Sequence, residues 1–299
     1  MKIVKERICP LIHLNCPPDI KCQQCINIPH SPALIEFQSV VFQTLVVVSM
    51  YNQEFKDILV NDHNIIPHLT NPLIQFASEY QLDKETDSQE QHDQQQSESS
   101  SSLSLIASSI NLLSNLIYDN NNICNVVINT PNAIHSLITL FGYNINIHFS
   151  QQNFQQSLSV RHNSRWCLYQ IHKYGDASAQ TEFVNARYVR VYAISICTAS
   201  GSVEDEDDEI NFGLFNFSEF LRDLHQGRYI SWLPQFPPQP LLARRVVEQI
   251  EEEGGNEEID SQQNNKGFGG DIKNSANEAK GRILNYFIEQ GNPRPRWYY

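Results

Sequence analysis

The sequence lacks an apolar run long enough to cross a bilayer, has few charged side chains, and shows no concentration of basic residues. Its most apolar stretch, Val40–Met50, is short and contains Gln43, Thr44 and Ser49, whereas a membrane helix needs about 20 apolar residues. Charged residues make up 18% of the chain, and the net charge is −13. Because nucleic acids and anionic membranes bind clustered Lys and Arg, we expect neither as a partner.

The negative charge is concentrated in three segments, Asp83–Glu98, Glu204–Glu209 and Glu248–Glu258. Such runs are typical of solvated surfaces. An acidic surface also suits a basic protein partner. On charge alone the two interpretations are equally supported.

Motifs of common enzymes are also absent from the sequence. G-x-S-x-G, H-E-x-x-H and the nucleotide-binding fingerprints do not occur, and the 10 histidines are scattered rather than paired at the spacing of metal ligands. The Gly-rich stretch Gly267–Asp271 is no phosphate-binding loop, because no strand precedes it and no Gly-Lys-Ser/Thr follows. We therefore expect no enzymatic activity and no cofactor.

What the chain does contain is a recurring pattern of short apolar helices. Apolar residues recur at helical period in Val40–Phe76, Ile106–Tyr143 and Arg161–Ser195, with polar turns between the helices and no strand alternation. Superposing Asn52–Leu69 on Asn120–Leu137 needs no gap. Recurring units of about 40 residues without strands predict stacked helical repeats of the HEAT/armadillo kind. Of these we expect an all-α, right-handed solenoid of degenerate armadillo repeats with disordered inserts.

The superposition brings apolar positions together, as expected for matching faces of a helix. Phe55 matches Ile123, Ile58 and Leu59 match Val126 and Val127, and Ile65 and Ile66 match Ala133 and Ile134. The offset of 68 positions (52 to 120) exceeds one repeat because a polar, low-complexity tract, Leu82–Ser102, lies between the two copies. Such a tract buries too little apolar surface to order itself.

These observations predict seven consecutive segments. They are an irregular N-terminal cap (1–30), an armadillo-like repeat (31–81), a disordered polar insert (82–103), two armadillo-like repeats (104–200), an acidic loop (201–210), C-terminal armadillo-like repeats (211–291) and a tail (292–299).

The seven cysteines are an odd number, and the N-terminus shows no continuous apolar segment of a secretory signal. We therefore expect reduced thiols and a location in the cytoplasm and nucleus. Cys124, Cys167 and Cys197 lie on apolar helical faces and are predicted to be core residues.

The other four cysteines form an N-terminal cluster near His13 and His30: Cys9, Cys16, Cys22 and Cys25. The last two make a C-x-x-C, and four such ligands could hold zinc tetrahedrally. The first two are not a second short-spaced pair, however. Partly buried free thiols that cap the first repeat are the favoured interpretation, and no metal site is predicted.

Four stretches resemble the armadillo array of importin-α, over roughly residues 35–290 and discontinuously. Leu221–Leu233 resembles the joint in which Gln-Gly separates two helices of the late repeats. Val246–Phe287 resembles the closing repeat, with Gly-Gly, Glu-x-Ile, Gln-Gln-Asn and Tyr-Phe in order. Arg165–Ile171 resembles the Trp-x-x-x-Asn helix that lines the peptide groove of the family, and Asn111–Leu116 resembles the same helix with its Asn kept.

The resemblance implies that the third helix of each repeat faces a concave groove. The mapped pairs on these helices are Gln43 and Val47, Asn111 and Asn115, and Trp166 and Gln170; none is the full Trp/Asn pair. A Trp there would form an apolar wall for Lys or Arg stems, and an amide one turn later would bond the backbone of an extended peptide. The residues so implied for peptide binding are Asn111, Asn115, Trp166 and Gln170.

The function that the resemblance implies is an adaptor in nuclear protein import that binds basic localisation peptides. Its partners would be proteins with basic extended segments, together with importin-β or an export factor. The family binds importin-β through a long basic N-terminal segment, for which this sequence offers only Lys2, Lys5, Arg7 and Lys21. The alternative is a general armadillo interaction scaffold without a transport role.

Overall fold

The computed structural model describes residues 3–86, 96–143, 151–198, 204–265 and 271–284. Over these residues the regular structure is helical, and β-type pairing is limited to two isolated bridges, Leu14 with Ile26 and Arg228 with Phe236. The all-α class predicted from the sequence is therefore confirmed. The chain divides into two compact units, residues 1–174 and 175–299.

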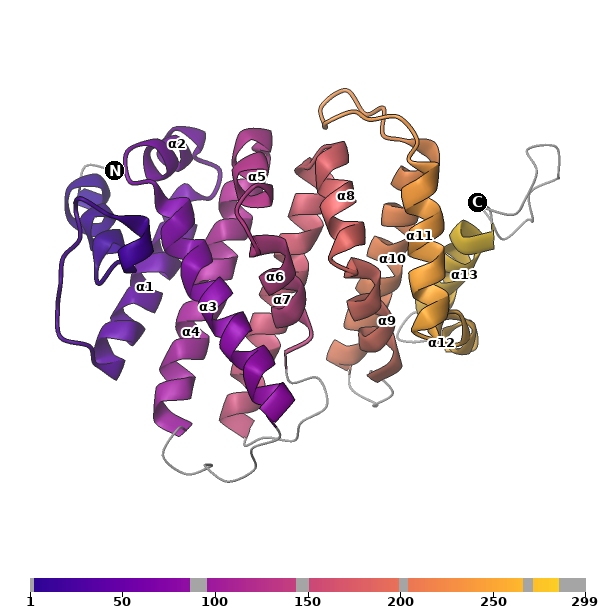
Figure 1. The fold of residues 1–299 in the computed structure, drawn as a ribbon, viewed down its shortest axis with the longest axis horizontal. Coiled ribbons are helices and arrows are strands. Elements are labelled where there is room, and N and C mark those ends of the chain that lie inside the picture. Colours follow the sequence, from indigo (N-terminus) through magenta and orange to yellow (C-terminus); the bar gives the residue numbers. More distant parts are fainter. Residues whose placement is uncertain (1–2, 87–95, 144–150, 199–203, 266–270, 285–299) are drawn as a thin grey trace. The chain divides into compact units, whose positions relative to one another are not determined.

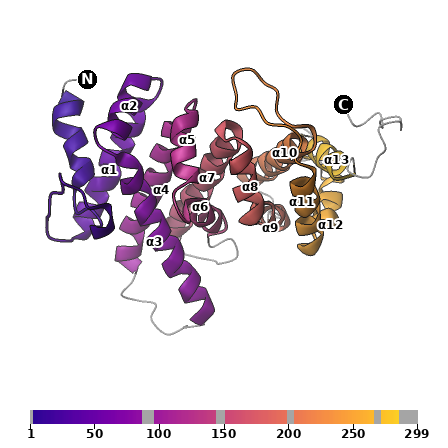
Figure 2. The same cartoon turned by 45° about the horizontal axis from the view of Figure 1, so that its top comes forward.

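The first unit contains four long helices, α1, α3, α4 and α7, and three short ones, α2, α5 and α6, among its described residues (Figure 1). Its α-helices in the described residues are α1 (Pro32–Ser49), α2 (Gln53–Asn61), α3 (Ile65–Thr86), α4 (Gln96–Ile117), α5 (Asn121–Ile128), α6 (Ala133–Phe141) and α7 (Gln151–Tyr174). Helix α4 packs between α1 and α7, while α3 packs against α4 and α6 (Figure 2). The long helices α1, α4 and α7 thus form one layer, and α3 and α6 lie against it.

Residues 3–30 precede α1 and form short helical turns joined by loops. One turn of π-helix (Val4–Ile8) leads into a 3₁₀ turn (Cys9–His13), which packs against α1 and α3. Further along, Asn15 ties the loop together: its Nδ2 donates to the Ile28 carbonyl at 2.7 Å, and its Oδ1 accepts from the Ile28 N–H at 2.7 Å.

The turns on both sides of α2 recur around α5, 68 positions later. Positive φ angles occur before each short helix, at Tyr51 and Asp119, and after it, at Asn64 and Asn132. Each short helix also begins with a side-chain cap. Asn52 accepts from the Phe55 N–H at 2.9 Å, and Asn120 accepts from the Ile123 N–H at 3.0 Å.

Burial follows the same correspondence. Phe55 and its counterpart Ile123 are both buried, as are Leu59 and Val127. One position before Val127, Val126 is 48% exposed, so it lies off the buried face. The two segments that superpose in sequence therefore share their turns and the buried face of their short helix.

Two of the predicted irregular segments are partly helical. Helix α3 continues to Thr86 and α4 begins at Gln96, so most of the insert predicted for residues 82–103 belongs to these helices; residues 87–95 lie outside the described ranges. Similarly, α10 begins at Glu204, within the acidic loop predicted for residues 201–210. Acidic side chains at a helix N-terminus interact favourably with the helix dipole, so a run of Asp and Glu can start a helix as well as form a loop.

Helix α1 is longer than the apolar run that the sequence singled out. Over Pro32–Ser49 it meets the length and composition of a membrane span, and 33% of it is buried inside the structure. The buried side chains include Phe42 and Leu45, which face the other helices of the unit, and Ser39, which donates to the Ser104 carbonyl of α4 at 3.1 Å. A helix packed within a globular unit passes the same composition test.

The second unit is centred on one long helix that contacts helices on several sides. Its α-helices in the described residues are α8 (Ala177–Asn185), α9 (Tyr188–Thr198), α10 (Glu204–Gln226), α11 (Pro240–Glu252), α12 (Gly255–Gln262) and α13 (Asp271–Leu284). Helix α10 packs against α9, α11 and α13. Its core includes an aromatic cluster in which the Phe183 and Tyr188 ring centroids lie 4.4 Å apart.

The joint after α10 differs in part from the resemblance to importin-α. Helix α10 ends at Gln226, and Gly227 follows with a φ of 74°, as the Gln-Gly joint implies. Residues Tyr229–Leu233 are not helical, however, because Arg228 pairs with Phe236 through backbone hydrogen bonds of 2.9 and 3.1 Å and the chain turns between them. The next helix starts only at Pro240, beyond the prolines of this turn.

Gly227→Ala is expected to destabilise the second unit by more than about 1–2 kcal/mol, the usual cost of a left-handed alanine. An added Cβ would also lie 2.6 Å from the Phe236 carbonyl oxygen. Gly254→Ala is the matched control, since its φ is 68° but its Cβ would meet its nearest neighbour only at 4.0 Å. Thermal unfolding of both variants checks this, and equal losses would contradict the steric argument.

Candidate peptide-binding surface

The layer of long helices carries a polar pocket on its surface, here termed the amide pocket. It has a volume of about 240 Å³, and the residues that line it come from α1, α4 and α7. They are Gln43, Leu103, Ser104, Ala107, Ser108, Asn111, Gln156, Ser159 and Asn163. Each of the three neighbouring helices thus contributes a carboxamide side chain to one site.

The three central carboxamides differ in the hydrogen bonds that they make within the protein. Asn111 is exposed, and it makes no hydrogen bond with the described residues. Gln43 donates to Ser39 Oγ at 3.3 Å, and Asn163 donates to the Ala107 carbonyl at 3.0 Å. Because a carboxamide has both donor and acceptor groups, this row can bond the N–H and C=O groups of an extended backbone.

The four residues implied by the resemblance have different environments. Asn111 lines the amide pocket, and Trp166 is 42% exposed, with its ring centroid 5.2 Å from that of Tyr169. Asn115 is half-buried: its Nδ2 donates to the Val46 carbonyl at 3.3 Å, and its Oδ1 accepts from Ser49 Oγ at 3.4 Å. Asn115 therefore links α4 to α1.

Gln170 lies in the interior, so the expectation that it faces a peptide is corrected. Its side chain is 1% exposed. The C-terminal part of α7 is covered on most sides, since Leu168 and Ile171 are also buried and α5 packs against the helix. In this part of α7, Gln170 is therefore buried although it lies only one turn after the exposed Trp166.

Asn163, unlike Gln170, lies at the surface of α7 on the same side as Trp166. Ser159, Asn163 and Trp166 are spaced four and three residues apart, which puts them on one face of α7. Ser159 and Asn163 line the amide pocket. The sequence thus offers a carboxamide about one turn upstream of Trp166 as well as one turn downstream.

Cationic residues of α7 near this face are engaged within the protein. Arg161 donates to the Tyr143 carbonyl at 3.3 Å, and an Arg165 guanidinium nitrogen lies 3.2 Å from His162 Nδ1. Of the acidic runs, Glu248–Glu258 lies in the second unit and is partly paired there: Arg244 with Glu248, and Arg190 with Glu253. Exposed pairs of this kind contribute little to stability.

A group of possible metal ligands lies outside the amide pocket, where the N-terminal segment meets α3. His13, Cys16, Cys22 and His68 bring their ligand atoms within 4.8 Å of one another. The predicted candidates Cys9 and Cys25 are outside this group; Cys9 is buried, and burial raises the pKa of its thiol to about 11. Burial, together with His13 and His63, lowers the pKa of His68 to about 4, so this ring is neutral at pH 7.

The cysteines predicted for the core are buried where the structure describes them. Cys124 and Cys167 are both 0% exposed, which confirms the prediction for these two. The side chain of Cys197 lies outside the described set.

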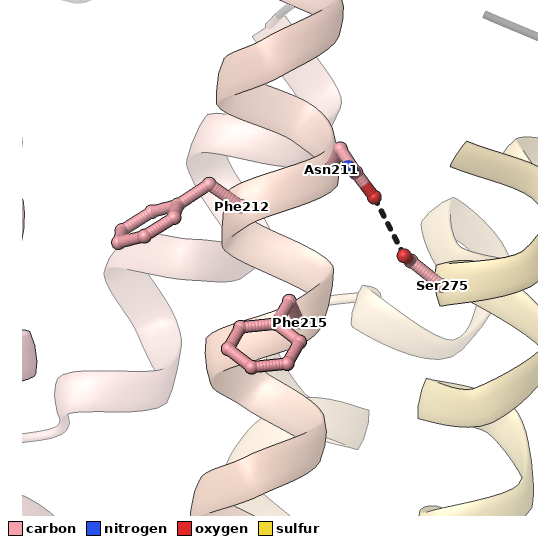
Figure 3. A pocket seen from close by; sticks show the side chains of 4 residues that line it. All are labelled: Asn211, Phe212, Phe215 and Ser275. Atoms are coloured by element: carbon pink, nitrogen blue, oxygen red, sulfur yellow. Dashed lines mark hydrogen bonds between the residues drawn. The ribbon is translucent and has the colours of Figure 1, made fainter. Parts of the chain in front are cut away.

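The second unit has a pocket of its own, between α10 and α13 (Figure 3). It has a volume of about 340 Å³ and is lined by Asn211, Phe212, Phe215 and Ser275. Ser275 Oγ donates to Asn211 Oδ1 at 2.6 Å, so two of its polar groups satisfy each other. Among the described residues, its lining contains no titratable side chain and no predicted site residue.

No protein-family model matches the sequence, and no curated protein matches it.

Proposed function

We propose that this chain is an interaction protein of the armadillo type that binds an extended peptide segment along the amide pocket. The observation that carries the proposal is the row of carboxamides that α1, α4 and α7 present side by side, Gln43, Asn111 and Asn163. An extended peptide exposes one N–H and one C=O per residue along each edge. Side-chain amides on successive helices can bond these groups without selecting a particular sequence.

Exposed apolar side chains flank this row and offer apolar surface that a bound peptide would bury. Val40 and Val47 of α1 are 57% and 72% exposed, and Trp166 of α7 is 42% exposed. On α1, Val40, Gln43 and Val47 are spaced three and four residues apart and share a face. Amide contacts would then fix the direction of the peptide, and apolar contacts would supply most of the affinity.

Nuclear import is the narrower form of this proposal. It is supported by the resemblance of Arg165–Ile171 and Val246–Phe287 to importin-α, and by the net charge of −13, which favours basic ligands over acidic ones. The alternative is an interaction scaffold whose peptide is not basic. The two forms share the amide pocket and differ in the charge of the ligand.

Asn111→Ala is expected to weaken peptide binding by about 1–3 kcal/mol, because it removes the amide that is open to solvent at the centre of the pocket. The measurement is a fluorescence anisotropy titration with two labelled peptides of equal length, one a basic localisation-type peptide and one neutral. Asn61→Ala is the matched control, since Asn61 is an exposed asparagine at the end of α2 and is absent from the pocket lining.

The two forms of the proposal give different results in this titration. Import requires that the basic peptide binds more tightly than the neutral one and that added salt weakens it. A scaffold of other specificity requires binding of the neutral peptide with little effect of salt. If neither peptide binds, or if Asn111→Ala binds as tightly as Asn61→Ala, peptide recognition in this pocket is rejected.

A further inference from the structure

Three residues of the N-terminal segment and one residue of α3 converge on a single point of the first unit. His13, Cys16 and Cys22 come from the irregular chain before α1, whereas His68 lies in the first turns of α3. One ligand atom from each of the four lies within 4.8 Å of the other three. His13 Nδ1 is 3.2 Å from Cys22 Sγ.

We propose that these four residues, His13, Cys16, Cys22 and His68, bind a structural zinc ion that fastens residues 3–30 to α3. This proposal is independent of the peptide-binding surface. It assigns a different set from the four cysteines that the sequence brought together.

Two imidazole nitrogens and two thiolates are a ligand set that zinc binds tetrahedrally. With bonds of about 2.0–2.1 Å to nitrogen and about 2.3 Å to sulfur, ligand atoms around zinc lie about 3.3–3.8 Å apart. The His13 Nδ1 to Cys22 Sγ distance of 3.2 Å is already in this region, and the other ligand atoms, within 4.8 Å of one another, would have to move closer by up to about 1.5 Å. Zinc bound to the two thiols would displace their protons, as it does for coordinating thiols in general.

The proposed ligands also have hydrogen-bond partners of the kind that orient metal ligands in proteins. His13 presents Nδ1 to Cys22, and its other nitrogen, Nε2, lies 3.1 Å from His63 Nδ1. A ligand histidine usually donates its second N–H to such a partner, which fixes the ring orientation. The Cys16 N–H donates to Cys25 Sγ at 3.2 Å, which holds the loop that carries both cysteines.

Burial gives a second, independent reason for a ligand at this point. His13 is 3% exposed and His68 is 5% exposed, and their ring centroids lie 5.0 Å apart in an edge-on arrangement. Buried imidazoles need partners for their nitrogen atoms. A metal ion between the rings and the two sulfurs would bind one nitrogen of each ring, and among the described residues no carboxylate belongs to the group.

A metal ion here would have a structural role, because residues 3–30 contain no long helix that packs the segment against the rest of the unit. The segment depends on short turns, on the Leu14–Ile26 bridge and on single contacts such as the 2.9 Å hydrogen bond from Gln38 Nε2 to the Leu14 carbonyl. Zinc would join residues 13, 16 and 22 to residue 68. Closing a loop of this length restricts the unfolded chain more than the folded one.

The test measures zinc in the full chain after purification under reducing conditions, so that a disulfide cannot imitate the cross-link. We expect about one zinc ion per chain, by elemental analysis, as in a structural tetrahedral site. Cys22→Ser and His68→Ala should lose most of the metal. Cys9→Ser should keep it, because Cys9 is a buried thiol of the same segment outside the ligand group.

Cobalt replacement and proteolysis make the test independent of whether each variant binds zinc tightly. Cobalt(II) in the wild-type chain should show thiolate charge-transfer bands and the intense visible bands of a tetrahedral ion, and Cys22→Ser should weaken both. A chelator should speed proteolysis within residues 3–30 in the wild type, while the helical circular dichroism signal remains. A wild-type chain that lacks stoichiometric zinc and gives no tetrahedral cobalt spectrum would overturn the proposal, as would equal metal loss in Cys9→Ser.

Discussion

Asp223→Ala is expected to lower the free energy of unfolding of the second unit by about 3–5 kcal/mol, the usual result of removing one partner from a buried ion pair. Asp223 and Arg228 side chains are 5% and 2% exposed. Asp223 Oδ2 accepts from Arg228 Nε at 2.9 Å and from a terminal guanidinium nitrogen at 2.7 Å. Without the carboxylate, the Arg228 charge would stay in the interior without its acidic partner.

The neighbours of this pair explain why the loss should be large. Arg228 also donates to the Gly175 carbonyl at 3.0 Å, and its guanidinium carbon lies 4.8 Å from the centroid of the Phe236 ring. The ion pair therefore joins the end of α10 to the start of the unit and to the turn that follows Gly227. Loss of the ion pair would therefore weaken the contacts between several backbone segments at once.

The measurement is urea-induced unfolding, combined with hydrogen exchange of the α10 amides to report on the second unit. Glu248→Ala is the matched control: its ion pair with Arg244 spans 3.0 Å, but the two side chains are 53% and 65% exposed. Exposed pairs of this kind contribute about 0.3–0.5 kcal/mol. A loss at Asp223 no larger than that at Glu248 would show that the buried pair does not hold the unit together.

Phe55→Ala is expected to destabilise the first unit by about 3–5 kcal/mol, because it removes a large buried side chain and leaves a cavity. Phe55 is 0% exposed. It lies in the first turn of α2, a helix that packs against both α1 and α3. Its backbone N–H is also the one that Asn52 caps, so its side chain and the start of the helix are fixed together.

The control is the same substitution at Phe37 of α1, which is 46% exposed. Much of that ring already contacts water, so we expect a loss of about 1 kcal/mol or less. Thermal unfolding of the two variants compares identical chemistry at two depths of burial. Similar melting temperatures for both would mean that α2 contributes little to the core of the unit.

Much of the helical pattern could be predicted because burial repeats with the period of a helix. The correspondence between Phe55 and Ile123 was visible in sequence because apolar residues mark the buried face of each short helix. Glu204, at the start of α10, was predicted to lie in a loop because apolar period is the main sequence signal for a helix. A polar or acidic helical end carries no such signal, although its backbone hydrogen bonds are the same.

The candidate sites were less predictable, because they depend on which helices meet. Gln170 and Asn163 are both plausible neighbours of Trp166 on one helix, but the fold buries Gln170 and leaves Asn163 in the lining of the amide pocket. His68 is remote in sequence from Cys22. No spacing rule joins these two residues, since the fold of the N-terminal segment brings them together.

Helix α3 contains Pro72, four residues after His68. Proline has no N–H to offer the carbonyl one turn earlier, and its ring crowds that carbonyl, so a helix bends or weakens at such a place. Within the single helix that runs on to Thr86 beside α6, the backbone hydrogen-bond ladder therefore lacks one bond directly after the turn that carries His68. The part of α3 that holds the candidate metal ligand is thus joined to the rest of the helix by a locally weaker turn.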